Sequence, residues 1–142
     1  MWLNISVIPF WFILIFFPNS KVCRFFVSSI FPLFLFGLVY IYLFYYFYVS
    51  EYDYLSNFSL YISLDNLRDL FSNNGFLIIF WTHFLVINLF CGSWMVKDSQ
   101  KFAMPKTLIF FPLLITYFTG PLGIFIYWLI RIFYAKRISL YD

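Results

Sequence analysis

The side chains able to do chemistry in this largely apolar chain gather on one segment. His83, the only histidine, is followed by Asn88, Cys91 and Asp98, and a helical wheel places all four within one half of the cylinder. An unpartnered polar group is costly in hydrocarbon, so these side chains must face protein or a water-filled cavity. One interpretation is a polar site at the bilayer midplane. The other is that His83 and Asn88 only hydrogen-bond to a neighbouring helix.

A second stripe of small and polar residues runs along the last apolar segment. At helical spacing it contains Pro112, Thr116, Thr119, Gly120, Gly123, Tyr127 and Arg131. Small residues allow close helix packing, and Pro121 removes a backbone donor, which predicts a kink in the helix. Arg131 is expected to extend to the membrane interface.

The two polar-faced helices could frame a pocket for an elongated apolar ligand with a polar end, or pack tightly without a pocket. The candidate ligand contacts are Asn88, Cys91, Thr116, Thr119, Gly120 and Tyr127.

The sequence supports no other chemistry. A single histidine without a second ligand at useful spacing gives no basis for a zinc, haem or di-iron site, and no nucleophilic triad or phosphate-binding loop is present. Cys23 and Cys91 are expected to be free thiols. The net charge of +3 comes from dispersed residues, so no nucleic-acid partner is expected.

The composition of the chain indicates whether water or lipid surrounds these side chains. Of the 142 residues, 64% are hydrophobic and only 11% are charged, whereas a soluble domain is about one-quarter charged. A domain of this size cannot hide such an excess in its core. We therefore expect an integral, multi-pass membrane protein with membrane lipid around it, in either a bacterial inner membrane or an organellar membrane.

The apolar runs predict an all-α fold, an integral membrane four-helix bundle forming one domain over residues 1–142. The expected spans are 2–17, 25–49, 75–96 and 107–134. In the polar segment 50–74, Ser63 is a plausible N-cap for a short amphipathic helix at the membrane interface; an ordinary solvated turn of helix is the alternative. With four crossings, the basic residues divide five against four between the two sides, so orientation stays open.

The same segments resemble a known family. The matching residues are Trp81, Thr82 and His83, then Asn88, Leu89, Phe90, Gly92, Trp94, Asp98 and Pro105, and the run from Phe118 to Arg131. Pro18, the Ile30–Phe31–Pro32 stretch and Ser63–Leu64–Asp65 also fit the pattern. On these residues the chain resembles the abscisic-acid-deficient-four-like proteins, small multi-pass membrane proteins typified by plant neoxanthin synthase.

The resemblance implies isomerisation of the epoxide violaxanthin to the allenic neoxanthin. That reaction needs an acid and a base but no redox cofactor; His83 and Asp98 would be the catalytic pair. Asn88 departs from the family, which usually has Asp there, and an amide cannot act as acid or base. The alternative is a non-catalytic protein that binds a carotenoid or other lipid, or serves as a subunit or assembly factor of a membrane complex. A homo-oligomer is a further expectation, and a transporter is the weakest alternative because neither an internal repeat nor a buried charge pair is expected.

Overall fold

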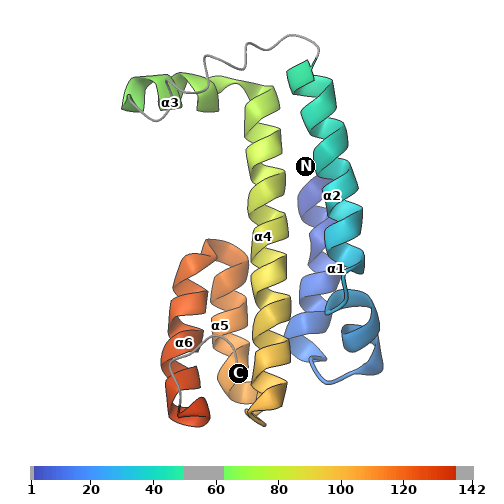
Figure 1. Cartoon of the computed structure of the whole chain (residues 1–142), viewed down its shortest axis with the longest axis vertical. Helices are drawn as coiled ribbons and strands as arrows, with labels where there is room; N and C mark the ends of the chain where they lie inside the picture. Colours follow the sequence, from blue (N-terminus) through green and yellow to red (C-terminus); the bar gives the residue numbers. More distant parts are fainter. Residues whose placement is uncertain (1, 50–62, 137–142) are drawn as a thin grey trace. The chain divides into compact units, whose positions relative to one another are not determined.

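The computed structural model describes residues 2–49 and 63–136, and within these ranges the chain is all-α with no strand. This confirms the predicted fold class at the level of secondary structure. The helices, in chain order, are α1 (Trp2–Phe16), the π-helical turn η1 (Cys23–Val27), α2 (Phe31–Phe44), the π-helical turn η2 (Tyr45–Val49), α3 (Leu64–Ser72), α4 (Asn74–Lys101), α5 (Lys106–Thr119) and α6 (Pro121–Ala135) (Figure 1).

The chain divides into two compact units. The first consists of Met1–Leu33 together with Leu85–Asp142, and the second of Phe34–Phe84. Helix α4 runs through both, with its C-terminal part in the first unit. The expectation of a single membrane domain stays a prediction.

The second unit contains the short helix that the polar segment predicts. Ser63 caps α3, because its hydroxyl accepts a hydrogen bond from the Asp65 amide at 3.2 Å. Asn73 ends α3 and starts α4: its amide donates to the Leu70 carbonyl, while its side-chain oxygen accepts from the Gly75 amide at 2.9 Å. The existence of this helix and its cap are confirmed, whereas residues 50–62 of the predicted polar loop lie outside the described residues.

The expected span 25–49 is corrected by a break near its start. The π-helical turn η1 ends at Val27, and α2 begins at Phe31 after three non-helical residues. Pro32 explains the break, since a proline ring clashes with the carbonyl four residues earlier in a continuous helix. The Ser29 hydroxyl then accepts a hydrogen bond from the Phe31 amide at 3.2 Å, at the new helix start.

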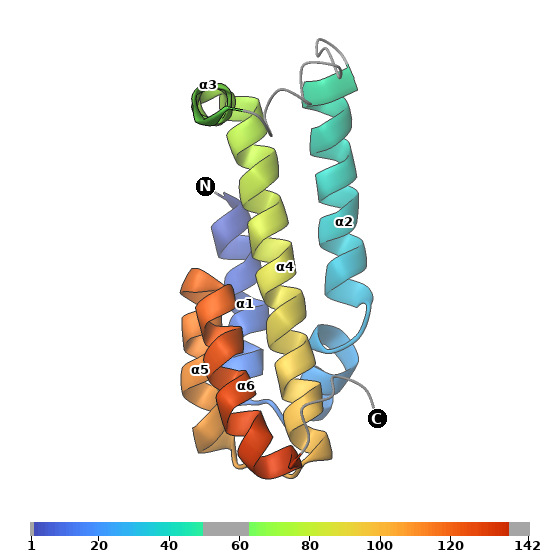
Figure 2. The same ribbon diagram turned by 60° about the vertical axis from the view of Figure 1, so that its left-hand side comes forward.

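The expected single span 107–134 is wrong, because the chain there forms two helices rather than one kinked helix. Gly120, between α5 and α6, has φ +63° and ψ −91°, a conformation that side chains disfavour. Pro121 then occupies the first position of α6, where a missing amide donor costs nothing. Both views show α5 and α6 folded back on one another, beside the C-terminal part of α4 (Figures 1 and 2).

Helix α1 completes the first unit and packs on α5 through aromatic rings. The rings of Trp11 and Tyr117 meet edge to face with centroids 5.4 Å apart. Gly92 of α4 makes room for this tryptophan, because a Cβ there would lie 2.8 Å from its ring. At the end of α4, the Gln100 side chain donates to the Pro18 carbonyl at 2.9 Å. The turn after α1 therefore lies beside the C-terminal end of α4.

One described helix, α4, has the length and apolar character needed to cross a membrane. It begins one residue before the predicted 75–96 span and ends five residues after it. Helices α1, α2, α5 and α6 are apolar but shorter. The four-helix membrane bundle therefore stays a prediction, while the helical content is established.

Candidate functional site

A buried charge pair joins α4 to α6. The Asp98 carboxylate of α4 accepts hydrogen bonds from the Arg131 Nε at 2.7 Å and from the Tyr127 hydroxyl at 2.7 Å. The Arg131 Nη2 donates to the second carboxylate oxygen at 3.3 Å. Arg131 and Asp98 are only 1% and 5% exposed. The expectation that Arg131 extends to the membrane interface is therefore wrong, because a buried carboxylate is within its reach.

Aromatic rings enclose the arginine of this pair. The guanidinium lies 5.0 Å from the centre of the Phe102 ring and 4.9 Å from that of Trp128, distances at which a ring face attracts a cation. Trp94 in turn packs edge to face on Tyr127, with centroids 5.7 Å apart. With both carboxylate oxygens bonded and the side chain nearly buried, Asp98 is suited to fastening α6 to α4.

A second polar contact lies at the turn between α5 and α6. Gly120 packs directly against the side chain of Asn88, and a Cβ at this glycine would overlap the amide oxygen. Asn88 is 4% exposed, and its Nδ2 is a buried donor without a protein partner within the described residues. The contact places the α5–α6 turn halfway along α4.

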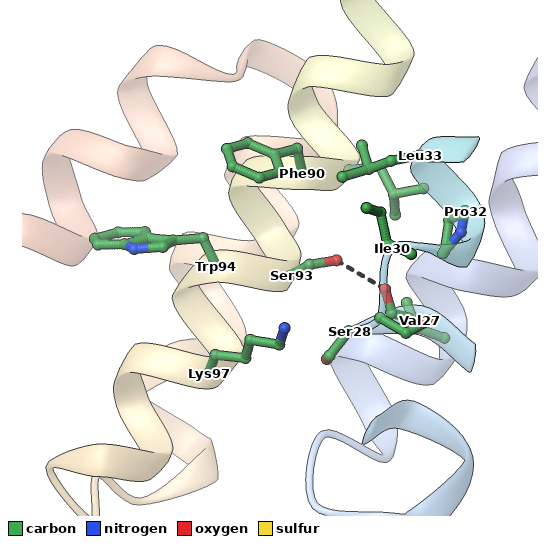
Figure 3. Close-up of a pocket in the computed structure, with 11 residues that line it drawn as sticks. Val27, Ser28, Ile30, Pro32, Leu33, Phe90, Ser93, Trp94 and Lys97 are labelled. Atoms are coloured by element: carbon green, nitrogen blue, oxygen red, sulfur yellow. Dashed lines mark hydrogen bonds between the residues drawn. The ribbon is translucent and has the colours of Figure 1, made fainter. Parts of the chain in front are cut away.

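The first unit also contains a pocket of about 310 Å³, between α4 and the segment that leads into α2. Ile30, Pro32, Leu33, Leu89 and Phe90 contribute its apolar walls, and Ser28, Ser93 and Lys97 contribute its polar groups. Figure 3 shows the polar groups at one end, with Lys97 pointing towards Ser28. The Ser93 hydroxyl donates to the Val27 carbonyl at 3.2 Å, which fixes one side of the opening. Such a pocket suits the end group of an apolar molecule that carries a polar substituent.

The structure brings some of the predicted site residues together and separates others. It joins Asp98 with Tyr127, and Asn88 with Gly120. The other candidate ligand contacts lie elsewhere: Thr116 is buried and bonded to the Pro112 carbonyl, Thr119 is exposed, and Cys91 is half-buried. None of the predicted ligand contacts lines the pocket.

The proposed catalytic residues do not meet. His83 is exposed, and its ring lies against that of Tyr40, with centroids 6.1 Å apart. Asp98 lies fifteen residues further along the same helix, a rise of about 22 Å at 1.5 Å per residue. Two groups so far apart cannot act on adjacent atoms of one substrate.

Both cysteines are free thiols, as expected from their positions. Within the described ranges, no three His, Cys, Asp or Glu side chains cluster as metal ligands would.

Sequence reasoning missed two features. The pairing of Arg131 with Asp98 had a signal, since each is an ionisable residue on the inward stripe of its own helix, and buried charges need partners. The pocket had a weaker signal, the Ser28–Ser29 interruption just before Pro32.

In the part of the chain that the structure describes, these features define a small helical protein with one helix long enough to cross a membrane, a buried ion pair and a pocket with one polar end. The chain belongs to the ABA4-like family, described as ABA DEFICIENT 4-like, which it matches over residues 1–127. The predicted family resemblance is thus confirmed. Comparison with curated proteins gave no match, and neither did comparison with solved structures. Family membership and the length of α4 together favour a membrane protein.

Proposed function

We propose that this chain is an integral, multi-pass membrane protein that binds the end group of a carotenoid or similar long apolar lipid without transforming it. The support for lipid as its solvent is the outer surface of the helices. Many large apolar side chains of α1, α5 and α6 are exposed, among them Phe12, Phe111, Phe118, Phe125 and Phe133 at 53%, 66%, 67%, 61% and 81%. Exposed apolar surface on this scale promotes aggregation in water, whereas in a bilayer it makes favourable contact with lipid chains.

The observation that carries the binding proposal is the pocket between α4 and the segment before α2. Its volume of about 310 Å³ suits a ring-sized group, so the remainder of a long ligand would lie along the apolar outer surface. The hydroxyl and amino groups of Ser28, Ser93 and Lys97 offer hydrogen bonds to an oxygen on such a ring. A hydroxylated or epoxidised carotenoid end group has this combination of shape and polarity.

The hydrogen bonds that Asp98 makes within the protein favour binding without catalysis. Isomerisation of an epoxide needs an acid and a base at neighbouring atoms. Asp98 is committed to Arg131 and Tyr127, and His83 lies about four turns away along α4. Asn88, where the family usually has an acid, cannot exchange a proton. We therefore expect no allenic product when membranes containing the protein are incubated with violaxanthin and the pigments are separated by chromatography.

The binding test uses protein purified in detergent from cells that make xanthophylls. The wild-type protein should retain a polyene absorption spectrum. Ser93→Phe fills the pocket and should reduce the bound pigment several-fold. Thr119→Phe introduces the same side chain at an exposed position and should leave the pigment unchanged. A colourless wild-type protein, or equal pigment loss in both variants, would contradict the proposal.

A further inference from the structure

The α5–α6 hairpin is too short to cross a bilayer. Helix α5 has 14 residues and α6 has 15, so each is about 21–23 Å long. A hydrocarbon core is about 30 Å thick. Helix α4, with 28 residues, is about 42 Å long and exceeds that thickness. If α4 spans the membrane, the hairpin beside it cannot reach both surfaces.

Two contacts fix the depth of the hairpin against α4. Its tip, Gly120, lies on Asn88, which is the fifteenth of the 28 residues of the helix. Its far end is held by the ion pair between Arg131 and Asp98, three residues before α4 ends at Lys101. The tip therefore lies at the level of the middle of α4, and both ends of the hairpin lie at the level of its C-terminus.

The same end of the first unit carries an excess of positive charge. Six exposed basic side chains lie on the helix ends and turns there: Lys21, Arg24, Lys97, Lys101, Lys106 and Lys136. The bond from Gln100 to Pro18 holds the turn bearing the first two beside the end of α4. Asp98 is the only acidic residue among the described residues of this unit, and Arg131 neutralises it. We call these six residues the basic collar.

We propose that α5–α6 is a re-entrant hairpin, entering and leaving the membrane through one face, and that the basic collar around it binds the anionic headgroups of that leaflet. The inference rests on the proposed membrane embedding. It replaces the crossing expected at 107–134 by an entry and an exit on one face, and it removes the near-even division of basic residues between the two sides. With the hairpin re-entrant, the whole collar lies on one side of the membrane, at the C-terminal end of α4. By the positive-inside rule, its excess of Lys and Arg assigns that side to the compartment from which the chain is inserted.

Cysteine labelling in sealed vesicles tests the hairpin. The background carries Cys23→Ala and Cys91→Ala, and single cysteines are introduced as Lys106→Cys, Lys136→Cys and, at the other end of α4, Asn74→Cys. We expect an impermeant maleimide to label the first two from one face and the third from the opposite face. Labelling of Lys106→Cys and Lys136→Cys from opposite faces would mean that the hairpin crosses the membrane, and would overturn the inference.

A carbonate wash of the same vesicles separates the two proposals. Protein retained in the membrane but labelled at Lys106→Cys and Lys136→Cys from opposite faces overturns the re-entrant hairpin alone. Protein released by the wash overturns the membrane embedding and the hairpin together.

Lipid retention tests the collar. The triple variant Lys101→Gln, Lys106→Gln and Lys136→Gln removes three exposed charges that take no part in the buried ion pair of Asp98 and Arg131. After reconstitution in mixed phosphatidylglycerol and phosphatidylcholine, mass spectrometry of the detergent-extracted protein should show several-fold less bound phosphatidylglycerol for the triple variant. Arg68→Gln, which removes a charge from α3 in the second unit, is the control and should retain the wild-type amount. Equal retention by the triple variant would overturn headgroup binding by the collar.

Discussion

Arg131 differs from the other basic residues of the first unit because its charge is removed from solvent. The six residues of the basic collar are exposed, whereas Arg131 is 1% exposed and bonded to Asp98. A buried pair of opposite charges contributes little net stability, but a single buried charge is strongly destabilising. The pair therefore favours one geometry, since docking α6 elsewhere on α4 would leave buried charges without a partner.

Replacing one partner of this pair should be far more harmful than replacing both. Arg131→Met leaves the Asp98 carboxylate buried without a countercharge and should lower the free energy of unfolding by about 3–5 kcal/mol. The double variant Arg131→Met with Asp98→Leu should recover most of that loss. Lys136→Met, at an exposed residue, is the control. Thermal unfolding in detergent, followed by circular dichroism, measures all three. A double variant as unstable as Arg131→Met would contradict this account.

The thiol of Cys23 provides a pH-dependent prediction outside the helices proposed to lie in lipid. Burial raises the pKa of this thiol above its ordinary value, and the hydrogen bond with Ser28 only partly opposes that shift. Because the thiolate is the reactive form, Cys23 should be alkylated more slowly at neutral pH than a free cysteine, and the rate should rise as the pH increases. Iodoacetamide labelling of the Cys91→Ala variant measures this rate. The same protein unfolded in dodecyl sulfate should react at the ordinary rate; equal rates in both states would argue against a buried thiol.

At the scale of elements, the stripe Pro112–Arg131 was predictable but its folding was not. Its members share a face at helical spacing, and all but Thr119 are buried. The sequence pattern continues unbroken across Gly120 and Pro121, so periodicity alone suggests one helix. The positive φ of Gly120 turns the kink into a reversal, and the turn then packs against Asn88 of α4, a contact that the periodicity of one segment cannot predict.

Gly123 should be the glycine least able to accept a side chain in the hairpin. A Cβ there would overlap the Thr116 backbone and hydroxyl and the Pro112 carbonyl of α5, so Gly123→Ala must push the two helices apart. We expect a loss of about 1–3 kcal/mol, the usual cost of overpacking. Gly37→Ala is the matched control: nothing lies within 4 Å of its added Cβ, so helix propensity should stabilise α2 by up to about 1 kcal/mol. Chemical unfolding in detergent compares the two variants, and equal effects would contradict the close approach of α5 and α6.

At the scale of the whole molecule, the motifs predicted the family, which is confirmed, and composition predicted a lipid environment, which stays a proposal. The hydrophobic content pointed to lipid, and the structure leaves large apolar side chains exposed on several helices. What composition could not supply is which polar residues meet, because this depends on how the chain reverses and on the depth at which helices pack. His83 and Asp98 share one half of a helical wheel, yet their separation along the axis keeps them apart. Asp98 and Arg131 lie on different helices, 33 residues apart in the sequence, and are in contact.

If the hairpin lies in lipid, the cost of introducing a charged side chain should depend on its depth in the bilayer, a dependence that a protein in water would not show. Phe118, next to the hairpin tip, and Phe133, near its base, are 67% and 81% exposed, so a lysine at either position would be harmless in water. In a bilayer, a charge at the level of the middle of α4 should cost about 2.5–3.5 kcal/mol of insertion free energy, whereas a lysine close to the basic collar can reach the headgroups. Phe118→Lys should therefore lower the amount of carbonate-resistant protein in membranes strongly, and Phe133→Lys should leave it near the wild-type level. Equal membrane levels of the two variants would place both positions at the same depth and contradict the tip of the hairpin lying inside the bilayer.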